Sequence, residues 1–160
     1  MNEHQLKIDL SKGKGVVGPS IAELEQWSAW VIQERNTSTE LSFRWVDEQE
    51  SADLNFQYRG KSGPTNVLSF GYQDETGVGS AFLGDIVICS ALVKKEADAQ
   101  GKPENHHWAH LVIHGILHLI GYDHDSNAEA AQMELLEIRL LRELGIANPY
   151  QRGASTKSHE

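Results

Sequence analysis

Four segments of the chain have the side-chain pattern or composition of β-strands. They are residues 1–10, 41–47, 65–72 and 82–89. The first two alternate apolar and polar side chains, while the last is rich in β-branched residues. The third and fourth flank the polar stretch 73–80, so we expect them to pair as a hairpin.

Five further segments have helical spacing or composition. They are residues 19–35, 48–57, 90–100, 103–121 and a last helix that ends before Gly145. The fourth begins at Pro103 and stops at Gly121, a residue suited to a left-handed turn. The last helix follows the capping-box pair Ser126 and Glu129 and carries an apolar stripe made of Met133, Leu136, Leu140 and Leu144.

These elements do not alternate as regular strand–helix–strand units, which favours an α+β fold. We expect a small mixed four-stranded sheet packed with about five helices in a single domain. A length of 160 residues fits one domain, assigned to residues 1–150, with 151–160 as a disordered tail.

Composition narrows the functional classes. With 39% hydrophobic residues and no apolar run of membrane-spanning length, the chain is expected to be soluble with no membrane partner. The N-terminus lacks a secretory signal, and the single cysteine, Cys89, suits a reducing compartment, so a cytoplasmic location is expected. The net charge of -9 opposes attraction to nucleic acid unless a few cationic groups gather at one site.

The helix at 103–121 carries three histidines four residues apart, His110, His114 and His118. Since the outer two lie about 12 Å apart along a helix axis, all three cannot bind one ion. Two neighbouring pairs remain, His110 with His114 or His114 with His118. Gly121 allows the chain to reverse and return His124 to the His118 end, which favours His114, His118 and His124 as the ligands. His106, His107 and His110 are then interpreted as surface or packing residues.

Three histidines leave one tetrahedral position of a zinc ion open, as in catalytic sites, and the chain lacks the cysteines of a structural site. The same histidine spacing occurs in zinc peptidases of the metzincin type. In those enzymes a general-base Glu follows the first histidine, but here that residue is Gly115, which cannot transfer a proton. Peptide hydrolysis by the usual mechanism is therefore disfavoured.

The stretch HGILHLIGYDH (114–124) resembles the signature HGxLHLxGYDH of the YbeY family of bacterial metal-dependent endoribonucleases. Two further stretches are similar to family motifs, LNFQYRGKSGPTNVLSF (54–70) and LGDIVI (83–88). The resemblance spans roughly residues 40–149. Ser62 and Gly71 depart from the family pattern, in which Asp and Pro are common at these places.

The resemblance implies one zinc ion on the three ligands and single-strand-specific endonucleolytic cleavage of ribosomal RNA. In the family this activity serves 3′-end maturation of the small-subunit RNA and ribosome quality control. It also implies a catalytic role for Arg59 and His114, with Arg59 and Lys61 binding substrate. A guanidinium can grip a phosphate with two hydrogen bonds and offset charge in the transition state. The implied partners are ribosomal RNA, ribosomal particles and ribosomal or GTPase assembly proteins.

Several interpretations stay open at this point. The chain could be a ribosome-assembly factor whose zinc is mainly structural, and Arg59 could form a surface salt bridge. Asp85 could orient a metal-bound histidine or cap a loop. Tyr58 could stack on a base or simply pack, and Asn66 could contact RNA or shape its strand. No carboxylate is assigned as general base.

Overall fold

Four strands form one mixed sheet in the computed structural model, which describes residues 6–33, 38–71, 82–121 and 127–150. The strands are β1 (Leu6–Lys12), β2 (Thr39–Val46), β3 (Val67–Gly71) and β4 (Phe82–Cys89). Their order across the sheet is β1-β2-β4-β3. The first three in this order are parallel, whereas β3 runs antiparallel to β4 and forms one edge. The expected hairpin of the third and fourth strands is confirmed.

Five helices accompany the sheet in the described part of the chain. They are α1 (Ile21–Val31), α2 (Glu48–Arg59), α3 (Ser90–Gln100), α4 (Glu104–Leu119) and α5 (Asn127–Glu143). The expected α+β fold, with a four-stranded mixed sheet and about five helices, is thus confirmed. The stretches 73–80 and 151–160, together with Ser126 of the expected capping box, lie outside the described residues.

Local sequence signals explain where the helices begin and end. Ser20 caps α1 through a complete capping box with Glu23, and Asp47 caps α2 by accepting a hydrogen bond from the backbone of Glu50. Pro103 precedes the first turn of α4, where its missing N–H costs nothing. Beyond α4, Gly121 has a φ of 118°, a backbone conformation that favours glycine.

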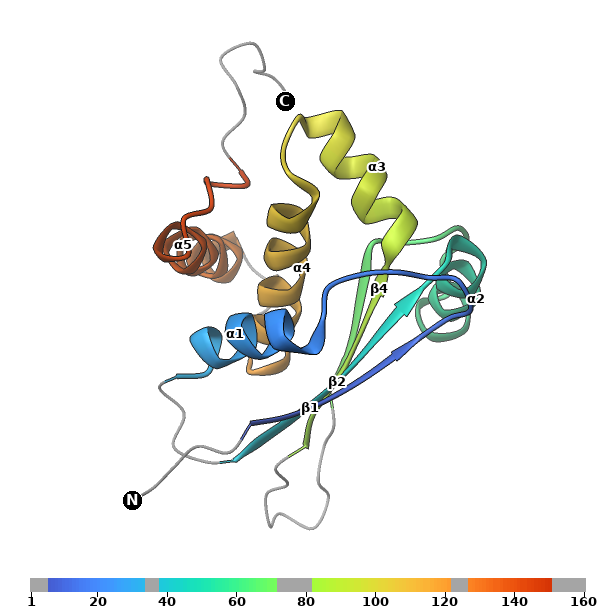
Figure 1. The fold of residues 1–160 in the computed structure, drawn as a ribbon, viewed down its shortest axis with the longest axis horizontal. Helices are drawn as coiled ribbons and strands as arrows, with labels where there is room; N and C mark the ends of the chain where they lie inside the picture. Colours follow the sequence, from blue (N-terminus) through green and yellow to red (C-terminus); the bar gives the residue numbers. More distant parts are fainter. Residues whose placement is uncertain (1–5, 34–37, 72–81, 122–126, 151–160) are drawn as a thin grey trace.

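The two faces of the sheet carry separate hydrophobic clusters because side chains alternate along each strand. On one face Phe43, Ile86 and other buried side chains pack against α4 and α1. On the opposite face a smaller cluster, including Leu68 and Val87, packs beneath α2. Figure 1 shows α1 and α4 on one side of the sheet and α2 on the other, with α5 lying beyond α4. Within the described residues, no helix has both the length and the apolar character needed to cross a membrane.

Candidate metal and phosphate site

The histidine-bearing helix α4 lies close against the sheet because Gly115 leaves room for this approach. A Cβ atom added at Gly115 would meet Ile86 Cγ2 at 3.1 Å and Ser69 Oγ at 3.2 Å. The residue that follows His114, the first expected ligand, therefore points into a packed interface. A glutamate here would have no space, so the structure adds a steric reason to the chemical one against a peptidase of the metzincin type.

His114 and His118 occupy consecutive turns of α4, so their side chains share one side of the helix. The His114 side chain is partly exposed and His118 is exposed, whereas their neighbours Ile113 and Leu117 are buried. Both rings can therefore reach solvent while the helix remains anchored in the core. His124, the third expected ligand, lies outside the described residues.

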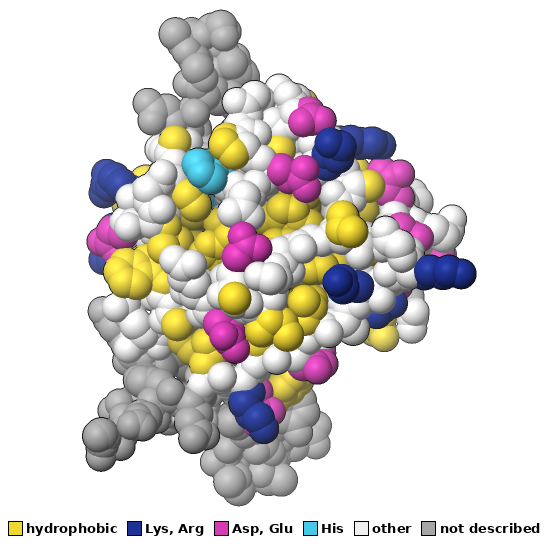
Figure 2. Space-filling view, in the orientation of Figure 1, with side chains coloured by type: hydrophobic (Ala, Val, Ile, Leu, Met, Phe, Trp, Pro, Cys, Tyr) yellow, Lys and Arg dark blue, Asp and Glu magenta, His cyan; other side chains and the backbone are white. Residues whose placement is uncertain are grey.

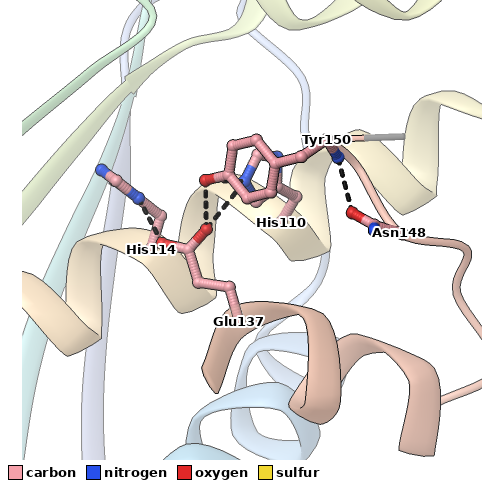
Figure 3. Close-up of polar contacts among 5 residues, drawn as sticks. All are labelled: His110, His114, Glu137, Asn148 and Tyr150. Carbon is pink, nitrogen blue, oxygen red and sulfur yellow. Dashed lines mark hydrogen bonds and ion pairs between the residues drawn. The ribbon is translucent and has the colours of Figure 1, made fainter. Parts of the chain in front are cut away.

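A buried carboxylate lies behind His114. Glu137, on α5, is fully buried, and its Oε2 lies 2.5 Å from Nδ1 of His114. Its Oε1 lies 3.2 Å from Nε2 of His110 and also accepts a hydrogen bond from the Tyr150 hydroxyl (Figure 3). Burial alone would raise the pKa of Glu137, but the hydrogen bonds from His110, His114 and Tyr150 together lower it to about 2. The carboxylate is therefore ionised at neutral pH.

His110, His114 and Glu137 also have the composition and proximity of a metal-binding group, with candidate ligand atoms within 4.8 Å of one another. Two ligand atoms of one tetrahedral zinc ion are about 3.3 Å apart, given bond lengths near 2.0–2.1 Å. The 2.5 Å between Glu137 Oε2 and His114 Nδ1 is shorter than this and matches a hydrogen bond. The contact therefore indicates a carboxylate that orients a histidine whose other nitrogen can bind the ion, a common arrangement in zinc proteins. The donor set around His114 thus fits a zinc-like ion.

Neither Glu137 nor Tyr150 was predicted as a site residue. A signal for Glu137 exists, because it stands four residues after Met133 and three before Leu140, inside the apolar stripe of α5. A charged residue at a core position needs a polar partner. Tyr150 has no comparable signal, since the chain reaches the site only by turning back after Gly145, where φ is 83°.

Arg59 and Lys61 lie at the C-terminal end of α2, where Gly60 ends the helix in a left-handed conformation. Both side chains are exposed. Arg44 pairs with Glu50 at 2.7 Å and Lys95 with Glu48 at 2.9 Å, whereas among the described residues Arg59 has no hydrogen-bond or ion-pair partner. The alternative of a surface salt bridge at Arg59 therefore finds no partner among these residues.

The structure groups the expected site residues into two sets. His114 and His118 lie above one face of the sheet, and the end of α2 lies on the other face, with Tyr58 in edge contact with Phe70 of β3. The edge strand β3 separates the two sets. Asp85 is paired with Phe70 and so faces α2, away from the histidines, which argues against its role in orienting them.

Asn66 and His107 have structural partners. The Asn66 side chain donates to Glu96 Oε1 at 3.1 Å, and the same oxygen lies 2.7 Å from Nε2 of the buried His107. Asn66 therefore links the start of β3 to α3, which agrees with the interpretation that it shapes its strand. His107 is a packing residue, as expected.

Comparison with known proteins places the chain in a family. The family model described as "Endoribonuclease YbeY" matches residues 14–145. A relative from Methylococcus capsulatus, "Endoribonuclease YbeY", is 47% identical over 146 residues, which are 91% of this chain and 96% of the relative. The solution structure of TM1509 from Thermotoga maritima is similar, with a TM-score of 0.57 and 26% identity, covering 92% of this chain and 100% of that one. The chain therefore belongs to the YbeY endoribonuclease family.

Proposed function

We propose that this protein is a zinc-dependent endoribonuclease that cleaves single-stranded segments of ribosomal RNA, with the ion held by His114, His118 and His124. The observation that carries the proposal is the hydrogen bond between the buried Glu137 carboxylate and His114, within the histidine signature of the family. A fully buried carboxylate behind one histidine of a solvent-accessible pair supports a metal site that substrate can reach.

In the proposed reaction the residues of the chain bind and orient the RNA. Arg59 would hold a backbone phosphate through bidentate hydrogen bonds from its guanidinium, and Lys61 would add a second positive charge at the same end of α2. An RNA strand crossing the edge at β3 would contact α2 on one face and reach His114 on the other. When bound, a zinc ion supplies a water of lowered pKa and stabilises negative charge on the attacked phosphate.

The charge distribution supports local rather than general attraction to RNA. On the face in Figure 2, Lys and Arg side chains are scattered in small groups and interspersed with Asp and Glu. The described residues form no broad basic surface on this face, in keeping with the net charge of -9. A few cations placed beside the cleavage site are therefore expected to direct a flexible single strand better than a rigid duplex.

The test compares metal content and cleavage of a single-stranded ribosomal RNA fragment by highly purified protein. We expect His114→Ala to lose both zinc and cleavage. Arg59→Ala should retain the fold and zinc but cleave RNA at least about 100-fold more slowly than wild type, which is the scale for loss of a donor that stabilises charge in the transition state. Lys7→Ala, on the far-edge strand β1, is the matched control and should leave both properties unchanged.

Two outcomes would reject the enzymatic role. Cleavage at the wild-type rate by both Arg59→Ala and His114→Ala would identify a contaminating nuclease. A zinc-loaded wild type that binds ribosomal particles without cleaving RNA would indicate an assembly factor with a structural ion. Mapping the 3′ ends of small-subunit RNA in cells that carry His114→Ala tests the proposed role in maturation and ribosome quality control, with ribosomal or GTPase assembly proteins as further proposed partners.

A further inference from the structure

We propose that Glu137, clamped by Tyr150 and His110, is the positioning residue of the site: it fixes the tautomer and orientation of the His114 ring, so that Nε2 is the nitrogen presented to the metal. The inference rests on the proposed function for the presence of the metal, but the hydrogen-bond arrangement can be tested without any ion. It assigns to the C-terminal segment a part in the site, because Tyr150 comes from the turn that follows α5.

The groups around Glu137 donate hydrogen bonds to its carboxylate and so favour the ionised form. Its side chain is fully buried, and a buried carboxylate is costly unless its oxygens receive hydrogen bonds. Three groups surround it, namely the rings of His110 and His114 and the hydroxyl of Tyr150. An apolar side chain would satisfy this position of α5 at lower cost, so the carboxylate indicates a requirement imposed by its partners.

The chemistry of the carboxylate decides the tautomer. An ionised carboxylate can only accept hydrogen bonds, so the proton of the neutral His114 ring must lie on Nδ1, 2.5 Å from Glu137 Oε2. The lone pair then belongs to Nε2. The alternative tautomer would place two acceptors against each other in a buried contact, which is strongly unfavourable.

Tyr150 and His110 hold the other oxygen of the same carboxylate. The Tyr150 hydroxyl donates to Oε1, and Nε2 of His110 lies 3.2 Å from that atom (Figure 3). The turn that delivers Tyr150 is itself fixed, because Asn148 Oδ1 accepts the Tyr150 backbone N–H at 2.7 Å. With Oε1 held from two sides, the direction in which Oε2 faces His114 is set.

The experiment measures the His114 tautomer and zinc affinity in parallel. Nitrogen-15 NMR of the imidazole rings in metal-free protein, assigned with His114→Ala, reports which ring nitrogen carries the proton. Chelator competition gives the zinc dissociation constant, and urea unfolding confirms that each variant is folded. The variants are Glu137→Gln and Tyr150→Phe, with Glu134→Gln as the control, since Glu134 is exposed one turn earlier on α5.

In wild type we expect the proton of His114 on Nδ1. Glu137→Gln should yield a mixture of tautomers and weaken zinc binding about 10- to 100-fold, the usual effect of losing such a carboxylate. Tyr150→Phe should retain the tautomer and weaken zinc binding several-fold, because Glu137 loses a constraint but remains. Glu134→Gln should match wild type in both measurements.

The positioning role is overturned if folded Glu137→Gln keeps the wild-type tautomer and zinc affinity. It is also overturned if zinc affinity falls while the tautomer stays the same, because Glu137 would then be a ligand or a purely structural group. Should Glu137→Gln fail to fold, an unchanged zinc affinity in folded Tyr150→Phe rejects the clamp. Failure of the proposed function has a different signature, namely zinc binding that His114→Ala does not reduce, whatever the tautomer of His114.

Discussion

At the scale of single residues, Gly84 of β4 occupies a position that has no space for a side chain. A Cβ atom there would lie 2.5 Å from the backbone oxygen of Phe70 and 2.8 Å from Leu119 Cδ2, on the helix that carries the histidines. We therefore expect Gly84→Ala to lower the free energy of unfolding by about 2–3 kcal/mol, through strain at the sheet and displacement of the end of α4. Urea unfolding measures this change.

Gly71 is the matched control for Gly84, because the two residues are paired in register. A Cβ atom at Gly71 would meet Leu119 Cδ2 at 3.8 Å, an ordinary contact. Gly71→Ala should therefore leave the free energy of unfolding within about 0.5 kcal/mol of wild type. Equal losses from the two substitutions would contradict the steric explanation.

The buried side chain of His107 is expected to make the stability of the protein depend on pH. Burial lowers the pKa of His107, an effect that its hydrogen bond to the Glu96 carboxylate only partly offsets, while Lys102 and His110 lower the pKa further. Since the unfolded residue titrates near 6.5, the unfolded state binds more protons than the folded state just below that pH. His107 should therefore make the protein lose stability as the pH falls through 6.5 toward the lower folded pKa.

Urea unfolding at pH 7.5 and 5.5 tests this dependence. The fall in stability between the two pH values should be smaller in His107→Gln than in wild type, because glutamine does not titrate. Identical falls in the two proteins would show that His107 is not the group responsible.

At the scale of elements, the segment between α2 and β3 is held in place by side chains of α2. Ser51 Oγ donates to the Thr65 carbonyl at 2.8 Å and accepts from the Thr65 N–H at 2.9 Å. Asn55 Nδ2 donates to the Gly63 carbonyl at 2.8 Å. Lys61 lies within this fastened segment, so its position depends on these contacts.

Ser51→Ala should therefore lower the free energy of unfolding by about 1–3 kcal/mol, because the partly buried N–H and carbonyl of Thr65 lose their partner. Binding of single-stranded RNA should weaken as well, since Lys61 is no longer held. Fluorescence anisotropy with a labelled RNA and urea unfolding measure the two effects. Ser62→Ala, on the same segment but exposed, is the control; a similar loss there would refute the role of Ser51.

The predictability of an element from sequence depends on whether its signals are local. Pro103, Gly121 and the apolar face between them were sufficient to predict α4, and the strand hairpin followed from its flanking patterns. The clamp on Glu137 joins α4, α5 and the turn at 146–150, so no local pattern contains it. The one signal in the sequence for this hydrogen-bond arrangement is the acidic residue Glu137 inside the apolar stripe of α5.

At the scale of the whole molecule, the sheet order decides how the two halves of the candidate site relate. The strand at the edge, β3, has α4 on one face and α2 on the other, so the histidines and Arg59 approach its edge from opposite sides. Sequence motifs predicted both groups but not this relation. Strand order depends on contacts between distant segments, which periodicity does not encode.

This arrangement predicts how RNA affinity depends on salt. Each phosphate neutralised on a single strand adds about -0.7 to the slope of log affinity against log salt. If Arg59 and Lys61 each hold one phosphate, Arg59→Ala should reduce the size of the slope by about 0.7, and the double substitution by about 1.4. Measurement in the non-cleaving His114→Ala background, between roughly 50 and 200 mM KCl, separates binding from catalysis.

Lys7→Ala serves as the control, because β1 lies at the sheet edge opposite β3 and its lysine is exposed. Its slope should equal that of the background protein. If Lys7→Ala reduced the slope as much as Arg59→Ala, RNA would be held by diffuse attraction rather than at the β3 edge. With a net charge of -9, such diffuse attraction is unfavourable, so we expect the local cations to account for the proposed RNA affinity.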